Sequence, residues 1–261
     1  MRSIVVTLRS RRDSCWWRLF ETVGLVMSKQ SKQVAPRLTQ AMENYLLSIY
    51  VVQERGEKVS NSKLVEQLRR VPASENLGTS LPAVSGMLRR MEKESLIKLG
   101  DSRDIDLTPR GRNLAESMIR KHRLAARMVV DLLDVPLHEV DAEAHMLEHA
   151  LSDTLEKRIQ KKLGNPKTDP FGQPIPGSGY REPRGVVKLD QAPTGKALVV
   201  DRIPEDDAEL VAYLHENGVL PGVELVVSDV APYRGVVTLQ VGDESAVLGY
   251  GVSREIRLRP K

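Results

Sequence analysis

The stretch Leu96-Ile-Lys-Leu-Gly-Asp-Ser-Arg-Asp-Ile-Asp-Leu107 decides the fold of the first half of the chain. Two short apolar runs flank a turn rich in Gly and Asp, which predicts a β-hairpin. Three segments with helical spacing of apolar residues precede it: Thr39 to Arg55, Ser60 to Leu68, and one that starts near Pro82. The pair Thr108-Pro109 then caps and opens a long helix through about Leu133.

The order helix, helix, helix, β-hairpin is that of a winged helix-turn-helix, whose third helix enters the major groove of DNA. Small residues in its first turns permit close approach to the bases, and basic residues can neutralise phosphates. Taken alone, those basic residues favour an ordinary solvated helix face, but the order of the elements favours DNA binding. The expected DNA-contacting residues are Ser80, Pro82, Ala83, Ser85, Gly86, Arg89, Arg90, Lys93 and Arg103.

A second informative feature is the motif His145-x-x-Glu148-His149, with Asp141 one turn before it. The motif lies in a segment that Pro136 opens and Leu163-Gly164 ends, and we expect one helix there. Residues three and four apart share a helix face, so these side chains form one stripe. Two imidazoles and a carboxylate suit a divalent transition metal, although such a pair without context is more often a solvated polar face.

Composition excludes several classes of protein. The 261 residues can hold more than one hydrophobic core, and no apolar run is long enough to span a bilayer. The single cysteine, Cys15, excludes an internal disulfide framework and a cysteine-rich zinc site. Aromatic residues make up 4% of the chain, which argues against recognition by stacked bases. The net charge of +4 permits an anionic partner.

The two ends of the chain have different characters. Met1 to Val26 carries several arginines and lacks both apolar periodicity and the core of a signal peptide, so we expect a disordered basic arm or a true start at Met27. The Pro- and Gly-rich run from Asn165 to Arg184 predicts a linker. Beyond it, short β-rich runs interrupted by one helix, Ala208 to Glu216, predict a small β-barrel. The expected strands are Ala197–Asp201, Val223–Val227, Val236–Val241 and Ile256–Leu258.

Taken in order, these segments resemble the DtxR/MntR family of iron- or manganese-dependent transcriptional repressors, over about Leu38 to Leu258. The most specific single stretch is Asp169-Pro-Phe-Gly-Gln-Pro-Ile-Pro-Gly177. Further matches are Glu43-Asn-Tyr-Leu-Leu-Ser-Ile-Tyr50, Pro82-Ala-Val-Ser85, Leu107-Thr-Pro-Arg-Gly111, Arg120-Lys-His-Arg-Leu124 and Glu148-His149.

The resemblance implies a mainly α-helical protein with a small β-barrel. Its expected parts are a basic extension (1–37), a winged helix-turn-helix domain (38–108), a helical metal-binding and dimerisation domain (109–164), a linker (165–186) and an SH3-like, FeoA-like domain (187–261). It also implies a homodimer that binds a pseudo-palindromic operator when loaded with metal. Such a regulator acts in the cytoplasm and needs no membrane.

The resemblance also implies a ligand set for the principal metal site. Its first-helix position falls on Asn44, where the family usually has Met or Asp; an amide offers only a neutral oxygen. The other three positions fall on His145, Glu148 and His149. The family usually has Cys or Glu at the first of these three, so His145 is a second departure.

For the ancillary site the match is less complete. His122 fits the family's histidine, Asp141 replaces another histidine, and Ala126 stands where a glutamate is usual. The SH3-like domain of iron-type members donates a carboxylate and an amide. Those positions fall on Asp207 and on Leu210, which has no side-chain donor; Asp206 or Glu209 can substitute.

This donor set of nitrogen and oxygen indicates Mn(II) or Fe(II), with a slight preference for manganese, and it also accepts Zn(II) or Co(II). We therefore expect a metal-activated repressor. Two alternatives stay open: a DNA-binding regulator whose metal site is degenerate or structural, and a metalloenzyme, for which no catalytic pattern accompanies the histidines. The segment Arg69 to Thr79 is longer than the family's usual connection before the third helix, and its role stays open.

Overall fold

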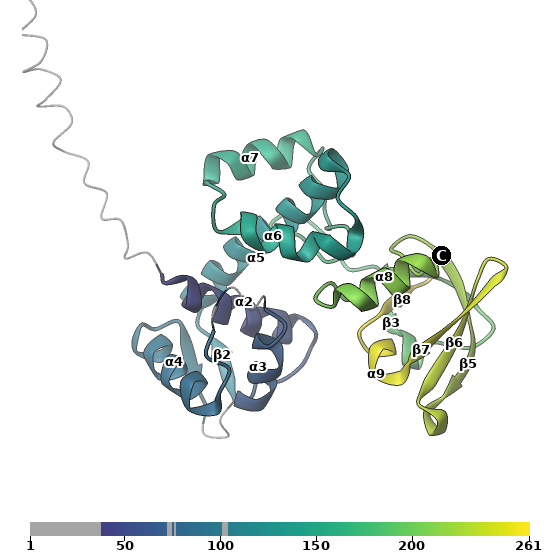
Figure 1. Ribbon diagram of the computed structural model, residues 1–261, viewed down its shortest axis with the longest axis horizontal. Coiled ribbons are helices and arrows are strands. Elements are labelled where there is room, and N and C mark those ends of the chain that lie inside the picture. Colours follow the sequence, from purple (N-terminus) through teal and green to yellow (C-terminus); the bar gives the residue numbers. More distant parts are fainter. Residues whose placement is uncertain (1–37, 72–74, 76, 101–103) are drawn as a thin grey trace, which may run out of the picture. The chain divides into compact units, whose positions relative to one another are not determined.

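The computed structural model describes residues 38–71, 75, 77–100 and 104–261, and from Thr39 to Lys261 they form one compact unit. Figure 1 shows helices in the first part of this unit and most of the strands in the last part. The predictions for residues 1–37 and for Arg103 lie outside the described residues.

The winged helix forms from the elements that the sequence predicts. Each of its three helices starts at a hydroxyl side chain that accepts a backbone N–H: Thr39, Ser60 and Ser80. Their apolar faces and the hairpin enclose one core, which includes Leu46, Leu88 and Ile97. The elements are α2 (Gln40–Glu54), α3 (Asn61–Leu68), α4 (Leu81–Lys93), β1 (Ile97–Leu99) and β2 (Ile105–Leu107), and the two strands pair antiparallel.

A tight joint connects the hairpin to the long helix α5 (Pro109–Leu133). The Thr108 hydroxyl donates to the carbonyls of Ser95 and Leu96 and accepts the N–H of Gly111 at 3.0 Å. Gly111 packs so close that a Cβ there would lie 2.0 Å from the Leu96 carbonyl oxygen. This contact explains why Leu107-Thr-Pro-Arg-Gly111 carries glycine at its end.

The prediction of a single helix from Pro136 to Leu163 is wrong. The chain forms a 3-10 turn, η2 (Leu137–Glu139), then α6 (Val140–Glu148) and α7 (Asp153–Lys162). The break has a local cause, because the Ser152 hydroxyl caps α7 by accepting the N–H of Leu155. Leu151 is buried at the break, so the interruption is packed into the core.

The segment after α7 holds its shape through one buried carboxylate. Asp169 Oδ1 accepts the N–H groups of Phe171 and Gln173 at 2.9 and 2.8 Å, which closes a turn around fully buried Phe171. Arg123 of α5 donates to the carbonyl of Pro174 in the same segment. These bonds anchor the Pro-rich stretch to both the helices and the C-terminal sheet, since Phe171 O accepts the N–H of Ile203.

The C-terminal part is the SH3-like fold that the sequence predicts. Its strands form one antiparallel sheet in the order β3-β8-β4-β5-β6-β7, and α8 (Ala208–Glu216) has the bounds expected for it. The strand β7 (Glu244–Gly249) was not predicted, because four of its six side chains are exposed and its apolar pattern is weak. The strands are β3 (Val187–Lys188), β4 (Ala197–Arg202), β5 (Glu224–Ala231), β6 (Val236–Val241), β7 and β8 (Arg257–Arg259); η3 (Leu189–Gln191), η4 (Pro232–Arg234) and α9 (Tyr250–Ser253) connect them.

A search of the described helices finds none with the length and apolar character needed to cross a membrane.

Candidate metal centre

The stripe predicted on α6 forms and faces inward. His145 and Glu148 are buried at 8% and 1% exposure, and His149, the residue that ends α6, is half-buried. The two imidazole rings lie 5.6 Å apart at nearly right angles. Asp141 lies on the same helix one turn earlier and is more exposed.

The carboxylate of Glu148 stands at the centre of this cluster. One oxygen, Oε2, lies 2.8 Å from Nδ1 of His122 on α5. The other, Oε1, lies 3.4 Å from His145 Nδ1 and 3.2 Å from His149 Nε2. Glu148 is therefore held from one side and presents its second oxygen between two histidines.

His149 is oriented by a residue of α2. Its Nδ1 lies 3.0 Å from Glu43 Oε2, which leaves Nε2 facing Glu148. The hydrogen bond to Glu43 raises the pKa of His149, and the negative charge of Glu148 raises it further. Partial burial acts in the opposite direction but has the smaller effect. A carboxylate behind a histidine is the usual support for a metal-binding imidazole, because it fixes the ring and its tautomer.

Asn44 enters the cluster from α2, as the family match implies, and it is almost fully buried. Its Nδ2 donates to Glu75 Oε2 at 2.8 Å, so its carbonyl oxygen is left for another partner. Glu75 belongs to the long connection between α3 and α4, and its Oε1 lies 3.6 Å from His145 Nε2. Sequence analysis did not identify this residue, and it noted only the length of the connection as a feature.

The described residues fit a divalent ion. Four buried atoms at the cluster have no hydrogen-bond partner among the described residues: Asn44 Oδ1, His145 Nε2, Glu148 Oε1 and His149 Nε2. Buried polar atoms are normally satisfied, so four such atoms on neighbouring residues fit the binding of a metal ion, which accepts electron pairs. Donor atoms of Glu75, His145 and His149 lie within 4.8 Å of one another, as do those of His122, His145 and Glu148. Nitrogen and oxygen donors at this spacing suit a transition metal ion.

His122 lies between two carboxylates, since its Nε2 is 3.4 Å from Asp141 Oδ1 while Nδ1 faces Glu148. Burial disfavours its charged form, but the hydrogen bonds to Asp141 and Glu148 outweigh that effect and raise its pKa well above the usual value. Ala126 is buried in the core and brings no donor. Both predicted ancillary residues, His122 and Asp141, are thus adjacent, and His122 also contacts Glu148.

The residues that the SH3-like domain brings near the cluster differ from the one that the family resemblance implies. Asp207 is exposed and caps α8 by accepting the N–H of Leu210 at 3.0 Å, so the structure does not bring it to the cluster. Glu205 and Asp206 instead line the cavity of about 70 Å³ that Asn44, His122 and Glu148 also line. Glu205 is 8% exposed, and its Oε2 has no hydrogen-bond partner. Burial, followed by the charge of Asp169, raises the pKa of Glu205 well above its usual value.

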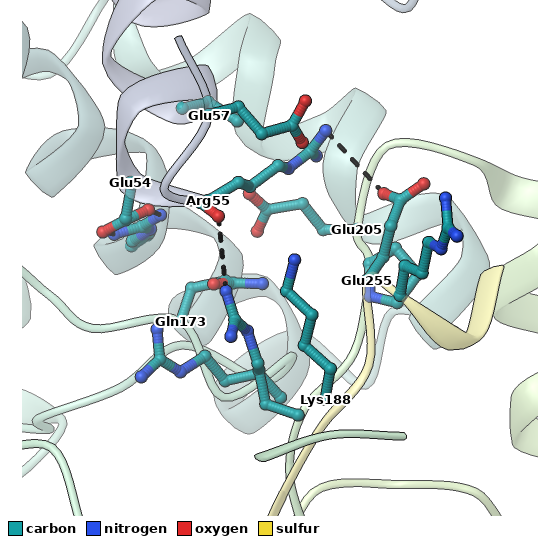
Figure 2. A pocket seen from close by; sticks show the side chains of 13 residues that line it. Glu54, Arg55, Glu57, Gln173, Lys188, Glu205 and Glu255 are labelled. Atoms are coloured by element: carbon teal, nitrogen blue, oxygen red, sulfur yellow. Dashed lines mark hydrogen bonds and ion pairs between the residues drawn. The ribbon is translucent and has the colours of Figure 1, made fainter. Parts of the chain in front are cut away.

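A second cavity, of about 50 Å³, lies beside Glu205 and is lined mostly by charged side chains. Figure 2 shows Arg55 and Glu57, which follow α2, at this cavity together with Glu255 and Lys188 of the C-terminal domain. Arg55 lies 3.7 Å from Glu255, and its carbonyl accepts a hydrogen bond from Arg257. At this cavity Arg55 therefore makes polar contacts with both Glu255 and Arg257 of the C-terminal domain.

The expected DNA-contacting face of α4 is open to solvent. Ser80 caps the helix, Pro82, Ala83 and Gly86 are exposed, and Ser85 is half-buried beside Asn61. Arg89 and Lys93 are exposed, while Arg90 pairs with Glu94 one turn later. Leu81, 56% exposed at the start of α4, is an apolar side chain that the sequence analysis did not single out.

A winged helix joined to a buried His/Glu/Asn cluster and an SH3-like domain defines a class of protein, the metal-responsive DNA-binding regulators. Residues 108–177 match the family described as iron dependent repressor, metal binding and dimerisation domain, and residues 187–260 match the FeoA domain family. The iron-dependent repressor IdeR of Mycobacterium leprae is 33% identical over 234 residues, which span 85% of this chain and 97% of that protein. The chain belongs to the DtxR family of metal-dependent transcriptional repressors and is not an enzyme.

Other relatives agree with this assignment. The diphtheria toxin repressor of Corynebacterium glutamicum is 32% identical, across 85% of this chain and 96% of its own length. Among solved structures, a manganese-dependent transcriptional repressor in complex with manganese is 30% identical, with a TM-score of 0.74 over 84% of this chain and 100% of that one. The manganese regulator SloR is 29% identical, with a TM-score of 0.70 over 86% and 100%.

Proposed function

We propose that this protein acts in the cytoplasm as a homodimer that represses genes of metal homeostasis by binding a pseudo-palindromic operator when it holds Mn(II) or Fe(II). The observation that carries the proposal is the cluster of four buried, unpartnered donor atoms from two domains. Asn44 belongs to the winged helix, whereas His145, Glu148 and His149 belong to the helical domain.

These residues would hold the ion. When bound, the ion supplies a positive charge that attracts donor atoms from both the winged helix and the helical domain. With α2 and α6 held at a fixed separation, α4 has a fixed position relative to the helical domain. In a dimer, the spacing of two recognition helices then matches two half-sites about one helical turn apart. Metal affinity and DNA affinity are therefore coupled, and the coupling must be reciprocal.

The donor set supports manganese slightly over iron, because the described cluster contains no sulfur ligand. The 30% identity to a solved manganese-dependent repressor supports the same choice. Zn(II) and Co(II) are expected to bind in the test tube, since intrinsic affinity rises along the series towards copper. The physiological metal would then depend on its availability in the cell.

The test is DNA binding with a duplex selected from a random library in the presence of Mn(II), titrated with Mn(II), anaerobic Fe(II) and Zn(II). We expect the loaded protein to bind at least about tenfold more tightly than the metal-free protein, which corresponds to the usual range of coupling free energies. His149→Ala should abolish the response to metal while the far-ultraviolet circular dichroism stays unchanged. Tight metal binding with equal DNA affinity would instead support a structural site.

A further inference from the structure

Glu75, in the connection between α3 and α4, reaches into the metal cluster. Glu75 is held there by two residues of α2, because Gln40 donates to its Oε1 at 3.0 Å and Asn44 donates to its Oε2 at 2.8 Å. Its side chain is 14% exposed, which is low for a carboxylate in a surface connection. These bonds aim its carboxylate at His145 and His149.

Glu75 adds a second negative charge to the principal metal site. Asn44 is neutral, so Glu148 alone would offer one negative charge to a divalent ion among the four residues of the principal site. With Glu75 the set holds two carboxylates and two imidazoles, and their charges balance a divalent ion. Hard carboxylate oxygens also favour Mn(II) and Fe(II) more than a neutral amide does.

Glu75 is also close in sequence to the recognition helix, whose cap is Ser80. Between them, the carbonyl of Gly78 accepts a hydrogen bond from the buried Tyr45 of α2 at 3.1 Å. Gly78 itself lies so near Ala83 that a Cβ there would meet the Ala83 Cβ at 2.8 Å. Gly78 is thus held against α2 on one side and lies close to α4 on the other.

We propose that Glu75 is a further ligand of the same ion, and that its coordination fixes the connection leading into α4. This inference rests on the proposed function, since it assumes that the cluster binds a divalent metal. It gives the connection a role in sensing, because the ion would be linked to α4 through Glu75 as well as through α2.

The test compares Mn(II) binding by wild type, Glu75→Gln, Glu75→Asp and a control, Glu66→Gln, whose side chain is 57% exposed on α3. Bound and free Mn(II) are separated by electron paramagnetic resonance. Glu75→Gln should weaken binding by at least the roughly tenfold that loss of a mere supporting residue costs. Glu75→Asp should recover part of the affinity, and Glu66→Gln should match wild type.

A second readout follows hydrogen exchange of the amides at residues 77–80. Mn(II) should slow their exchange in wild type but not in Glu75→Gln, whereas amides of α6 should be protected in both proteins. Wild-type Mn(II) affinity in Glu75→Gln, together with its loss in His149→Ala, would overturn the role of Glu75 and leave the proposed function standing. Failure of the wild-type protein to bind Mn(II) would overturn both. Melting curves without metal confirm that each variant is folded.

Discussion

The two histidines of the cluster are held in different ways. His149 has a dedicated carboxylate, Glu43, on its far nitrogen, whereas the nearest neighbours of His145 are Glu75 and Glu148, which themselves belong to the cluster. The sequence predicted His145, Glu148 and His149 from helical spacing, because that spacing acts within one element. It could not predict Glu75 or Glu43 as their partners, since these contacts depend on how separate elements pack.

At this scale, Glu43→Gln should weaken Mn(II) binding by about 10–100-fold, although Glu43 does not touch the ion. Glutamine keeps the size of the side chain but is a poorer acceptor for the His149 N–H. Isothermal titration with Mn(II) measures the change. An affinity equal to wild type would mean that the hydrogen bond between Glu43 and His149 does not support the site.

At the scale of elements, the sequence predicted best where a helix has its own start signal. Thr39, Ser60 and Thr108 each precede a strong apolar period, so α2, α3 and α5 were found with nearly correct bounds. The break between α6 and α7 was missed, because Ser152 lies inside a helical pattern and serine has only an intermediate helix propensity, which does not by itself mark a break. A capping residue that lies within an unbroken helical spacing of apolar residues can be identified only when the packing around it is known.

The joint between hairpin and α5 gives a prediction for this scale. Gly111→Ala should destabilise the protein by more than about 2 kcal/mol, because the new methyl group collides with a backbone carbonyl that cannot move aside. Gly86→Ala is the matched control, since a Cβ at that helical position meets nothing within 4 Å. It should stabilise the protein by up to about 1 kcal/mol. Urea unfolding of the metal-free proteins measures the change in the free energy of unfolding for each variant. Equal changes in the two variants would contradict the close approach of Gly111 to the Leu96 carbonyl.

For the whole molecule, the notable contact joins the winged helix to the SH3-like domain. Asp206 accepts hydrogen bonds from Arg55, Gln67 and Arg70 at 3.0 to 3.2 Å, and Glu255 lies near both arginines. Burial would raise the pKa of Asp206, but Arg55 and Arg70 outweigh it, and the pKa lies below its usual value. The SH3-like domain thus contacts the DNA-binding part as well as the metal cavity.

Because the folded-state pKa of Asp206 is depressed, its contribution to stability is present above the unfolded value of about 3.9 and is lost as the pH falls through the folded value. Asp206→Asn should therefore cost about 1–3 kcal/mol at pH 7, where it leaves the arginines without their carboxylate. The difference from wild type should shrink below about pH 4. Chemical denaturation at pH 7, 5, 4 and 3 measures it, and a difference independent of pH would contradict this ionic role.

The amide of Asn44 has a consequence for what can replace it. Its Nδ2 donates to Glu75, and its Oδ1 is buried without a hydrogen-bond partner among the described residues. An aspartate at this position would lack the N–H donor and would place a second carboxylate beside that of Glu75. Asn44 and Glu75 are therefore coupled, and we expect a change at one of them to alter what the other can bind.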